Sequence, residues 1–177
     1  AVKSWGFAFA GSTLQSLNAG RQGIGDALNL MNLIAAGTGR PEIANAPAVS
    51  SGFSLGGFYS SYWPEILPER FITVSGHSGM AGNAGRWFVG ETYSPVSLPD
   101  ASKTVPGLFM TGSQDTTVTT DVVRNAWRTF RHQLGKMAYS IEWRGGHDLY
   151  DEYANQGMAL DFGYMDRVIR NRYPMPM

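Results

Sequence analysis

The chain has 177 residues, of which 43% are hydrophobic and 16% charged, the composition of a globular protein large enough to bury an ordinary core. Its 14 basic residues balance 14 acidic ones, so the net charge gives no overall field to attract nucleic acid or a membrane surface. The chain has no cysteine, which excludes disulfides, thiolate metal ligands and a thiol nucleophile.

The first part of the chain predicts one strand and one helix. Trp5–Gly11 is a short apolar run ended by glycine, which is typical of a buried strand. After a polar stretch, apolar residues recur at helical spacing over residues 24–35, and glycines with a following proline mark the end of this helix near Gly37.

The next segment contains a G-x-S-x-G motif between an apolar strand at 48–53 and an apolar helix that begins at Gly57. This is the pattern of a nucleophile elbow, in which a strained strand-to-helix turn exposes a serine, here Ser54. Gly52 and Gly56 would leave room where backbone approaches backbone. The Leu55 N–H, at the start of the helix, would face a developing oxyanion. Such a motif also arises by chance in a chain with 22 glycines, so its partners matter.

After the elbow we expect a helix closed by Pro64 and a strand at 71–75. The stretch from about 76 to 104 is glycine-rich and aperiodic, and we interpret it as a loop on the substrate side. It contains Trp87, whose ring could contact substrate or simply pack the loop onto the core. Ser75–Met80 includes a second Gly-x-Ser, but without the elbow spacing, so we place His77 in the cleft lining.

Two further strands each lead to a polar residue suited to catalysis. The run at 105–111 ends at Gly112 and is followed by Asp115. A helix from Asp121 to Gly135 comes next, and then a strand at 137–143, which is followed by Arg144, two glycines and His147. A last helix carries apolar residues between positions 158 and 169.

The order serine, aspartate, histidine, each after a separate strand, predicts a catalytic triad at the carboxyl ends of a parallel sheet. His147 would take the proton of Ser54, and Asp115 would orient the imidazole. Asp148 is too close to His147 in sequence to orient it well, and Asp121 fits a charge in the first turn of a helix. Asp100 and Glu91 are alternatives if the acid follows the preceding strand.

Residues 48–170 resemble the C-terminal two-thirds of an α/β-hydrolase. The residues that carry the resemblance are Gly52–Gly57 for the elbow, Pro68–Phe71 for the next strand entry, Gly112 with Asp115 for the acid turn, and Gly146 with His147 for the histidine loop. The doubled Gly56–Gly57 is similar to the polyhydroxybutyrate depolymerase and feruloyl esterase branch. The resemblance implies one α/β catalytic domain over 1–177, with a mainly parallel sheet flanked by helices and the first strands missing.

The second oxyanion donor of that family comes from the loop after its third strand. If Trp5–Gly11 is the fourth strand, this loop is absent, and a companion N-terminal chain of the same protein would supply it. In the other register, Phe7–Gln15 is the oxyanion strand and loop. We prefer the first register, because the segment leads straight to one helix and the elbow strand and lacks a His-Gly-Gly type motif.

The resulting hypothesis is a serine hydrolase that cleaves small or polymer-derived carboxylic esters through an acyl-enzyme, with Phe53, His77 and Trp87 contacting substrate. The alternatives are a non-catalytic relative or inactive fragment that binds a ligand or partner, and an amidase or peptidase. We expect no cofactor and no metal, because the three histidines are far apart and no nucleotide motif occurs. No apolar run is long enough to span a membrane. The sequence does not determine the cellular compartment and slightly favours a secreted protein.

Overall fold

The computed structural model describes residues 19–79, 100–148 and 154–172. The chain divides into two compact units, residues 1–46 and 47–177, which we describe separately. In the first unit, helix α2 (Ala19–Thr38) is followed by the short helix η1 (Pro41–Asn45), which confirms the predicted helix and extends it at both ends. Gly39 ends α2 with φ of 67°, a conformation that favours glycine. The predicted strand at Trp5–Gly11 lies outside the described residues.

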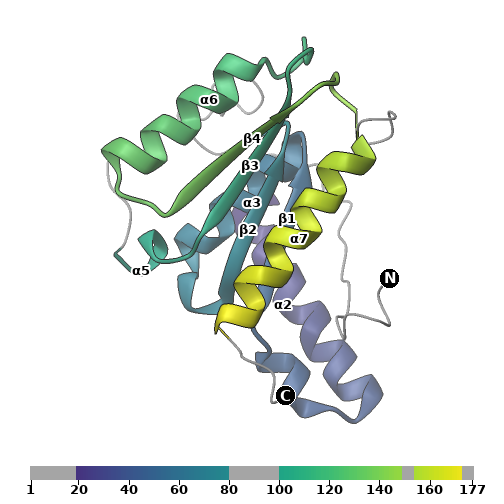
Figure 1. Ribbon diagram of the computed structural model, residues 1–177. Coiled ribbons are helices and arrows are strands. Elements are labelled where there is room, and N and C mark those ends of the chain that lie inside the picture. Colours follow the sequence, from purple (N-terminus) through teal and green to yellow (C-terminus); the bar gives the residue numbers. More distant parts are fainter. Residues whose placement is uncertain (1–18, 80–99, 149–153, 173–177) are drawn as a thin grey trace. The chain divides into compact units, whose positions relative to one another are not determined.

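The described residues of the second unit form a four-stranded parallel sheet in the order β1-β2-β3-β4 (Figure 1). The strands are β1 (Ala48–Phe53), β2 (Phe71–His77), β3 (Gly107–Gly112) and β4 (Ala138–Trp143). All four were predicted, although β2 continues two residues beyond its predicted end and β3 starts two residues later. Because the strands are parallel, their carboxyl ends lie at the same edge of the sheet.

Helices cover both faces of this sheet (Figure 1). α3 (Leu55–Ile66) and α6 (Thr120–Arg128) lie on one face, where Phe109 of β3 packs with Val123, Phe130 and Phe58. α7 (Ala154–Arg172) lies on the other face, where its Tyr164 packs against Leu108 and Met110 of β3. The alternation of Leu108, Phe109 and Met110 between the two faces is the period of two expected of a strand, and all three are fully buried.

The ends of two helices differ from the prediction. Pro64 lies inside α3 and does not end it, since helix geometry continues for two more residues and the Leu67 N–H still donates to the Trp63 carbonyl. Pro64 removes one N–H donor from the helix, and the last turn of α3 nevertheless forms. α6 passes into a π-helical turn, η3 (Thr129–Gln133), before Gly135 at φ of 70°.

The predicted loop at about 76–104 begins and ends in regular structure. Gly76 and His77 complete β2, and Asp100–Lys103 form the short helix α5. A third short helix, η2 (Pro68–Arg70), precedes β2. None of the helices in the described ranges is long and apolar enough to cross a membrane.

Candidate active site

Ser54 lies at the sharp turn between the end of β1 and the start of α3. Its backbone has φ of 54° and ψ of −120°, a left-handed conformation that is costly for a residue with a Cβ. A Cβ on Gly52 would collide with the backbone of Gly56, so the turn requires glycine at position 52. A Cβ on Gly56 would meet nothing within 4 Å, so the room that we predicted there is not needed.

Gly57, the second glycine of the Gly56–Gly57 pair, allows close packing between α3 and β2. A Cβ on Gly57 would lie 2.8 Å from the Gly79 carbonyl oxygen and 3.1 Å from that of His77. Both oxygens belong to the end of β2 and the turn that follows it. Gly57 therefore lets α3 lie directly against the end of β2.

The structure brings Ser54, His147 and Asp115 into one chain of hydrogen bonds. Ser54 Oγ is 3.0 Å from His147 Nε2, and His147 Nδ1 is 2.7 Å from Asp115 Oδ2. A neutral imidazole with its proton on Nδ1 satisfies both contacts: the hydroxyl donates to Nε2, and Nδ1–H donates to the carboxylate. The three residues come from the turns after β1, β4 and β3, where the sequence placed them.

Asp115 is held as a fully buried carboxylate. Its Oδ1 accepts hydrogen bonds from the Thr117 and Val118 N–H groups, both at 2.8 Å, while Oδ2 is used by His147. The backbone N–H of Asp115 donates to the Gly112 carbonyl at the end of β3. These bonds fix the plane of the carboxyl group.

His147 is less buried than its partner, with 19% of its side chain exposed. Its ring lies 4.8 Å from the Phe53 ring, centroid to centroid, at an interplanar angle of 40°. We expected Phe53 to contact substrate, and in the structure its ring packs against the imidazole. This contact and the bond to Asp115 restrict the imidazole from two sides.

Leu55, the predicted oxyanion donor, is the first residue of α3. The N–H groups in the first turn of a helix have no partner within the helix, and the helix dipole favours negative charge there. The Ser54 carbonyl is used by the Phe58 N–H at 3.1 Å, which closes the first turn. Residues 7–15, the alternative source of a second donor, lie outside the described residues.

His77 was predicted to line the active-site cleft, and the structure places its side chain elsewhere. Its side chain is buried, and its Nε2 is 2.8 Å from Asp161 Oδ2 of α7. Asp161 was not predicted as a functional residue, although position 161 lies four residues before the predicted core residue Met165 and therefore on the same helix face. Leu160, by contrast, is 51% exposed. Trp87, the third predicted substrate contact, lies outside the described residues.

Asp100 and Asp121, which were weighed as alternatives to Asp115, form ion pairs with basic side chains. Asp100 is almost fully exposed on α5 and pairs with Lys103 at 2.8 Å. Asp121 lies in the first turn of α6, as predicted, and pairs with Arg124 at 2.9 Å. Glu91 lies outside the described residues. Within the described ranges, no three histidine, aspartate or glutamate side chains gather into a possible metal site.

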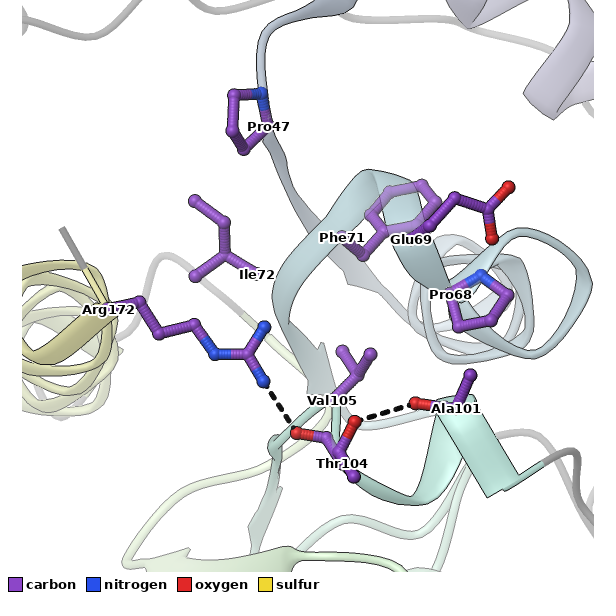
Figure 2. A pocket seen from close by; sticks show the side chains of 9 residues that line it. All are labelled: Pro47, Pro68, Glu69, Phe71, Ile72, Ala101, Thr104, Val105 and Arg172. Atoms are coloured by element: carbon purple, nitrogen blue, oxygen red, sulfur yellow. Dashed lines mark hydrogen bonds between the residues drawn. The ribbon is translucent and has the colours of Figure 1, made fainter.

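A small pocket lies at the opposite edge of the sheet, near the amino ends of the strands (Figure 2). Its volume is about 180 Å³, and Phe71, Ile72 and Val105 form its apolar wall. Figure 2 shows Arg172 reaching across to the Thr104 carbonyl, to which its Nη2 donates at 2.8 Å. Ligand sites usually have volumes of roughly 300–1,000 Å³. Its size and its distance from the carboxyl ends of the strands separate this pocket from the Ser54 site.

Solved structures with the same fold include hydrolases. Esterase PE8 superposes with a TM-score of 0.54 at 21% identity over 89% of this chain and 67% of its own. Acylaminoacyl peptidase from Pyrococcus horikoshii has a TM-score of 0.57 at 14% identity, over 86% of this chain and 28% of its own. A variant of SOBER1 from Arabidopsis thaliana has a TM-score of 0.56 at 18% identity, over 81% of this chain and 63% of its own.

These neighbours, together with the parallel sheet flanked by helices, show that the chain has the α/β-hydrolase fold. The chain spans between 28% and 67% of the length of these three proteins. No family model matches the sequence. A search of curated proteins likewise finds no match.

Proposed function

We propose that the protein is a serine hydrolase that cleaves carboxylic esters through an acyl-enzyme. The observation that carries the proposal is the hydrogen-bonded chain Ser54–His147–Asp115, with Ser54 in a left-handed turn at the start of a helix. A free serine hydroxyl is a weak nucleophile and needs an adjacent, oriented base. His147 has the contacts for that function on both ring nitrogens.

In the proposed reaction, Ser54 Oγ attacks the ester carbonyl carbon while its proton passes to His147 Nε2. The tetrahedral oxyanion faces the Leu55 N–H, and Asp115 stabilises the imidazolium. When the carbonyl re-forms, the bond to the alcohol oxygen breaks and Nε2 returns its proton to the leaving alcohol. A water molecule then repeats both steps on the acyl-enzyme and releases the acid.

The proposal is tested with a p-nitrophenyl ester and a fluorophosphonate probe that labels activated serines. Ser54→Ala should lower kcat by about three orders of magnitude or more and abolish labelling, since members of a triad act as a unit. Ser51→Ala is the matched control, because Ser51 is an exposed serine on the same strand, three residues before Ser54. Equal hydrolysis by wild type and Ser54→Ala would contradict the proposal.

An amide substrate is the alternative within the same chemistry, since one structural neighbour is named a peptidase. An amine is a poorer leaving group than an alcohol and must receive its proton from His147 before the C–N bond breaks. Comparing kcat/KM for an ester and an anilide with the same acyl group separates the two. We expect the ester to be hydrolysed faster, and a faster anilide would identify an amidase.

A further inference from the structure

The face of β2 that contacts α7 carries a buried row of polar side chains. Thr73, Ser75 and His77 alternate along the strand and are at most 5% exposed. Buried polar groups are destabilising unless they are hydrogen-bonded. α7 provides partners for the two ends of the row: the Tyr164 hydroxyl lies 3.1 Å from Thr73 Oγ1, and Asp161 binds His77.

The His77–Asp161 pair forms one end of this row. His77 Nε2 donates to Asp161 Oδ2 at 2.8 Å, and Ser75 Oγ lies 3.4 Å from the same nitrogen. The two side chains are only 6% and 5% exposed. A buried pair of this kind is often no more stable than apolar side chains of similar volume. A contribution to folding stability therefore does not by itself explain why the His77–Asp161 pair is buried here.

The backbone of the same residues supports Ser54. The His77 carbonyl accepts the Ser54 N–H at 2.8 Å, directly beside the end of β1. Ser78 follows with φ of 48° and is held by its N–H bond to the Met110 carbonyl at 2.7 Å. Gly79 then lies so close that a Cβ there would collide with the Ser54 carbonyl.

Ser54 and Ser78 are the two non-glycine residues with positive φ in the described part of the chain, and the residues on both sides of Ser78 approach the Ser54 backbone. A backbone in such conformations persists only when its surroundings over-determine it. For Ser54, those surroundings are the end of β2 and the turn after it. The side chain of His77 joins that strand end to α7 through Asp161.

We propose that His77 and Asp161 are a positioning pair for the nucleophile. By tying the carboxyl end of β2 to α7, the pair keeps the Ser54 backbone in place and its hydroxyl 3.0 Å from His147 Nε2. Neither side chain contacts a reacting atom. The inference rests on the proposed function, because it requires that Ser54 is the nucleophile. It predicts an effect on kcat and on the reactivity of Ser54, with KM unchanged.

The test compares His77→Leu, His77→Gln and the double variant His77→Leu/Asp161→Leu. His77→Leu leaves a buried, unpaired carboxylate and should lower the unfolding temperature. The double variant removes both polar partners, so its unfolding temperature should return towards that of wild type. If the pair positions Ser54, kcat and the rate of fluorophosphonate labelling stay about tenfold or more below wild type in the double variant, with KM within about twofold.

His77→Gln keeps an N–H donor for Asp161 and should recover most of the lost kcat. Wild-type kcat in a stable double variant would overturn the inference and leave the pair a structural one. If the double variant does not fold, equal kcat in His77→Leu and His77→Gln, measured where both are folded, overturns it instead. Undiminished hydrolysis by Ser54→Ala would overturn the proposed function as well, so the two failures are distinguishable.

Discussion

The Gln114 N–H donates to the Gly145 carbonyl at 2.8 Å and so joins the turn that carries Asp115 to the turn that carries His147. Next to this bond, the Ser113 N–H donates to the Trp143 carbonyl, also at 2.8 Å. The hydrogen bonding between β3 and β4 thus continues beyond both strands into the candidate site. The distance between acid and base is set by backbone as well as by the side chains themselves.

Gly112 lies under this junction and gives the first prediction. A Cβ at position 112 would collide with the carbonyl groups of Gly145 and Gly146. Gly112→Ala should therefore displace the His147 turn and lower kcat by about a hundredfold, since a shift near 1 Å can cost that much. Activity of a folded variant, checked by circular dichroism, measures this. Wild-type kcat in Gly112→Ala would show that the two turns adjust without loss.

The second prediction concerns the acid. Asp115→Asn keeps the size of the side chain but favours the wrong imidazole tautomer, so kcat should fall by about 10⁴ while the fold is retained. Asp100→Asn is the control, because Asp100 is exposed and forms an ion pair with Lys103. Ester hydrolysis by both variants is the measurement. Loss in Asp100→Asn with near-normal activity in Asp115→Asn would move the acid to the earlier position.

The two glycines of the doubled pair should respond differently to alanine. Gly57→Ala should destabilise the protein and lower kcat, because its Cβ would lie 2.8 Å from the Gly79 carbonyl oxygen and push α3 off the end of β2. Gly56→Ala meets no such contact and should leave stability unchanged or raise it by up to ~1 kcal/mol. Urea unfolding and ester hydrolysis of the two variants check the difference. A greater loss in Gly56→Ala would contradict it.

A pH-dependent prediction comes from Glu65 of α3. Burial raises the pKa of Glu65 to about 8, against the opposing effect of the Lys136 charge. A raised pKa in the folded state contributes stability that is fully present below the ordinary pKa of 4.5 and is lost as the pH rises towards 8. Glu65→Gln has no such titration. The unfolding free energy of wild type should therefore fall relative to that of Glu65→Gln from about pH 5 to about pH 7, by at most ~1.4 kcal/mol per pH unit.

Urea unfolding at the two pH values measures that difference. Glu69→Gln provides the control, since Glu69 is exposed a few residues along the chain. A constant difference between wild type and Glu65→Gln over this range would show that Glu65 titrates alike in the folded and unfolded chains.

Most of the fold could be read from local sequence. Strand β1, the elbow and the start of α3 follow from an apolar run, glycine spacing and a second apolar run, each a short-range pattern. The order of Ser54, Asp115 and His147 after three separate strands also predicted which residues meet, because parallel strands bring their carboxyl ends to one edge. The end of α3 was misjudged at Pro64, because helix geometry continues for two more residues and the Leu67 N–H donates to the Trp63 carbonyl.

The tertiary structure alone decided which polar residues are buried and what they contact. His77 was expected in the cleft lining and is instead a buried partner of Asp161, which follows it by 84 positions. No local pattern joins the two, because their contact depends on how α7 packs across β2. The sequence by itself determined the strands, the elbow and the three residues at the carboxyl edge of the sheet. The packing of α7 and of the turn at Ser78 decided what holds the Ser54 backbone. Burial and hydrogen bonding between distant segments exist only in the folded chain, so no local pattern could predict them.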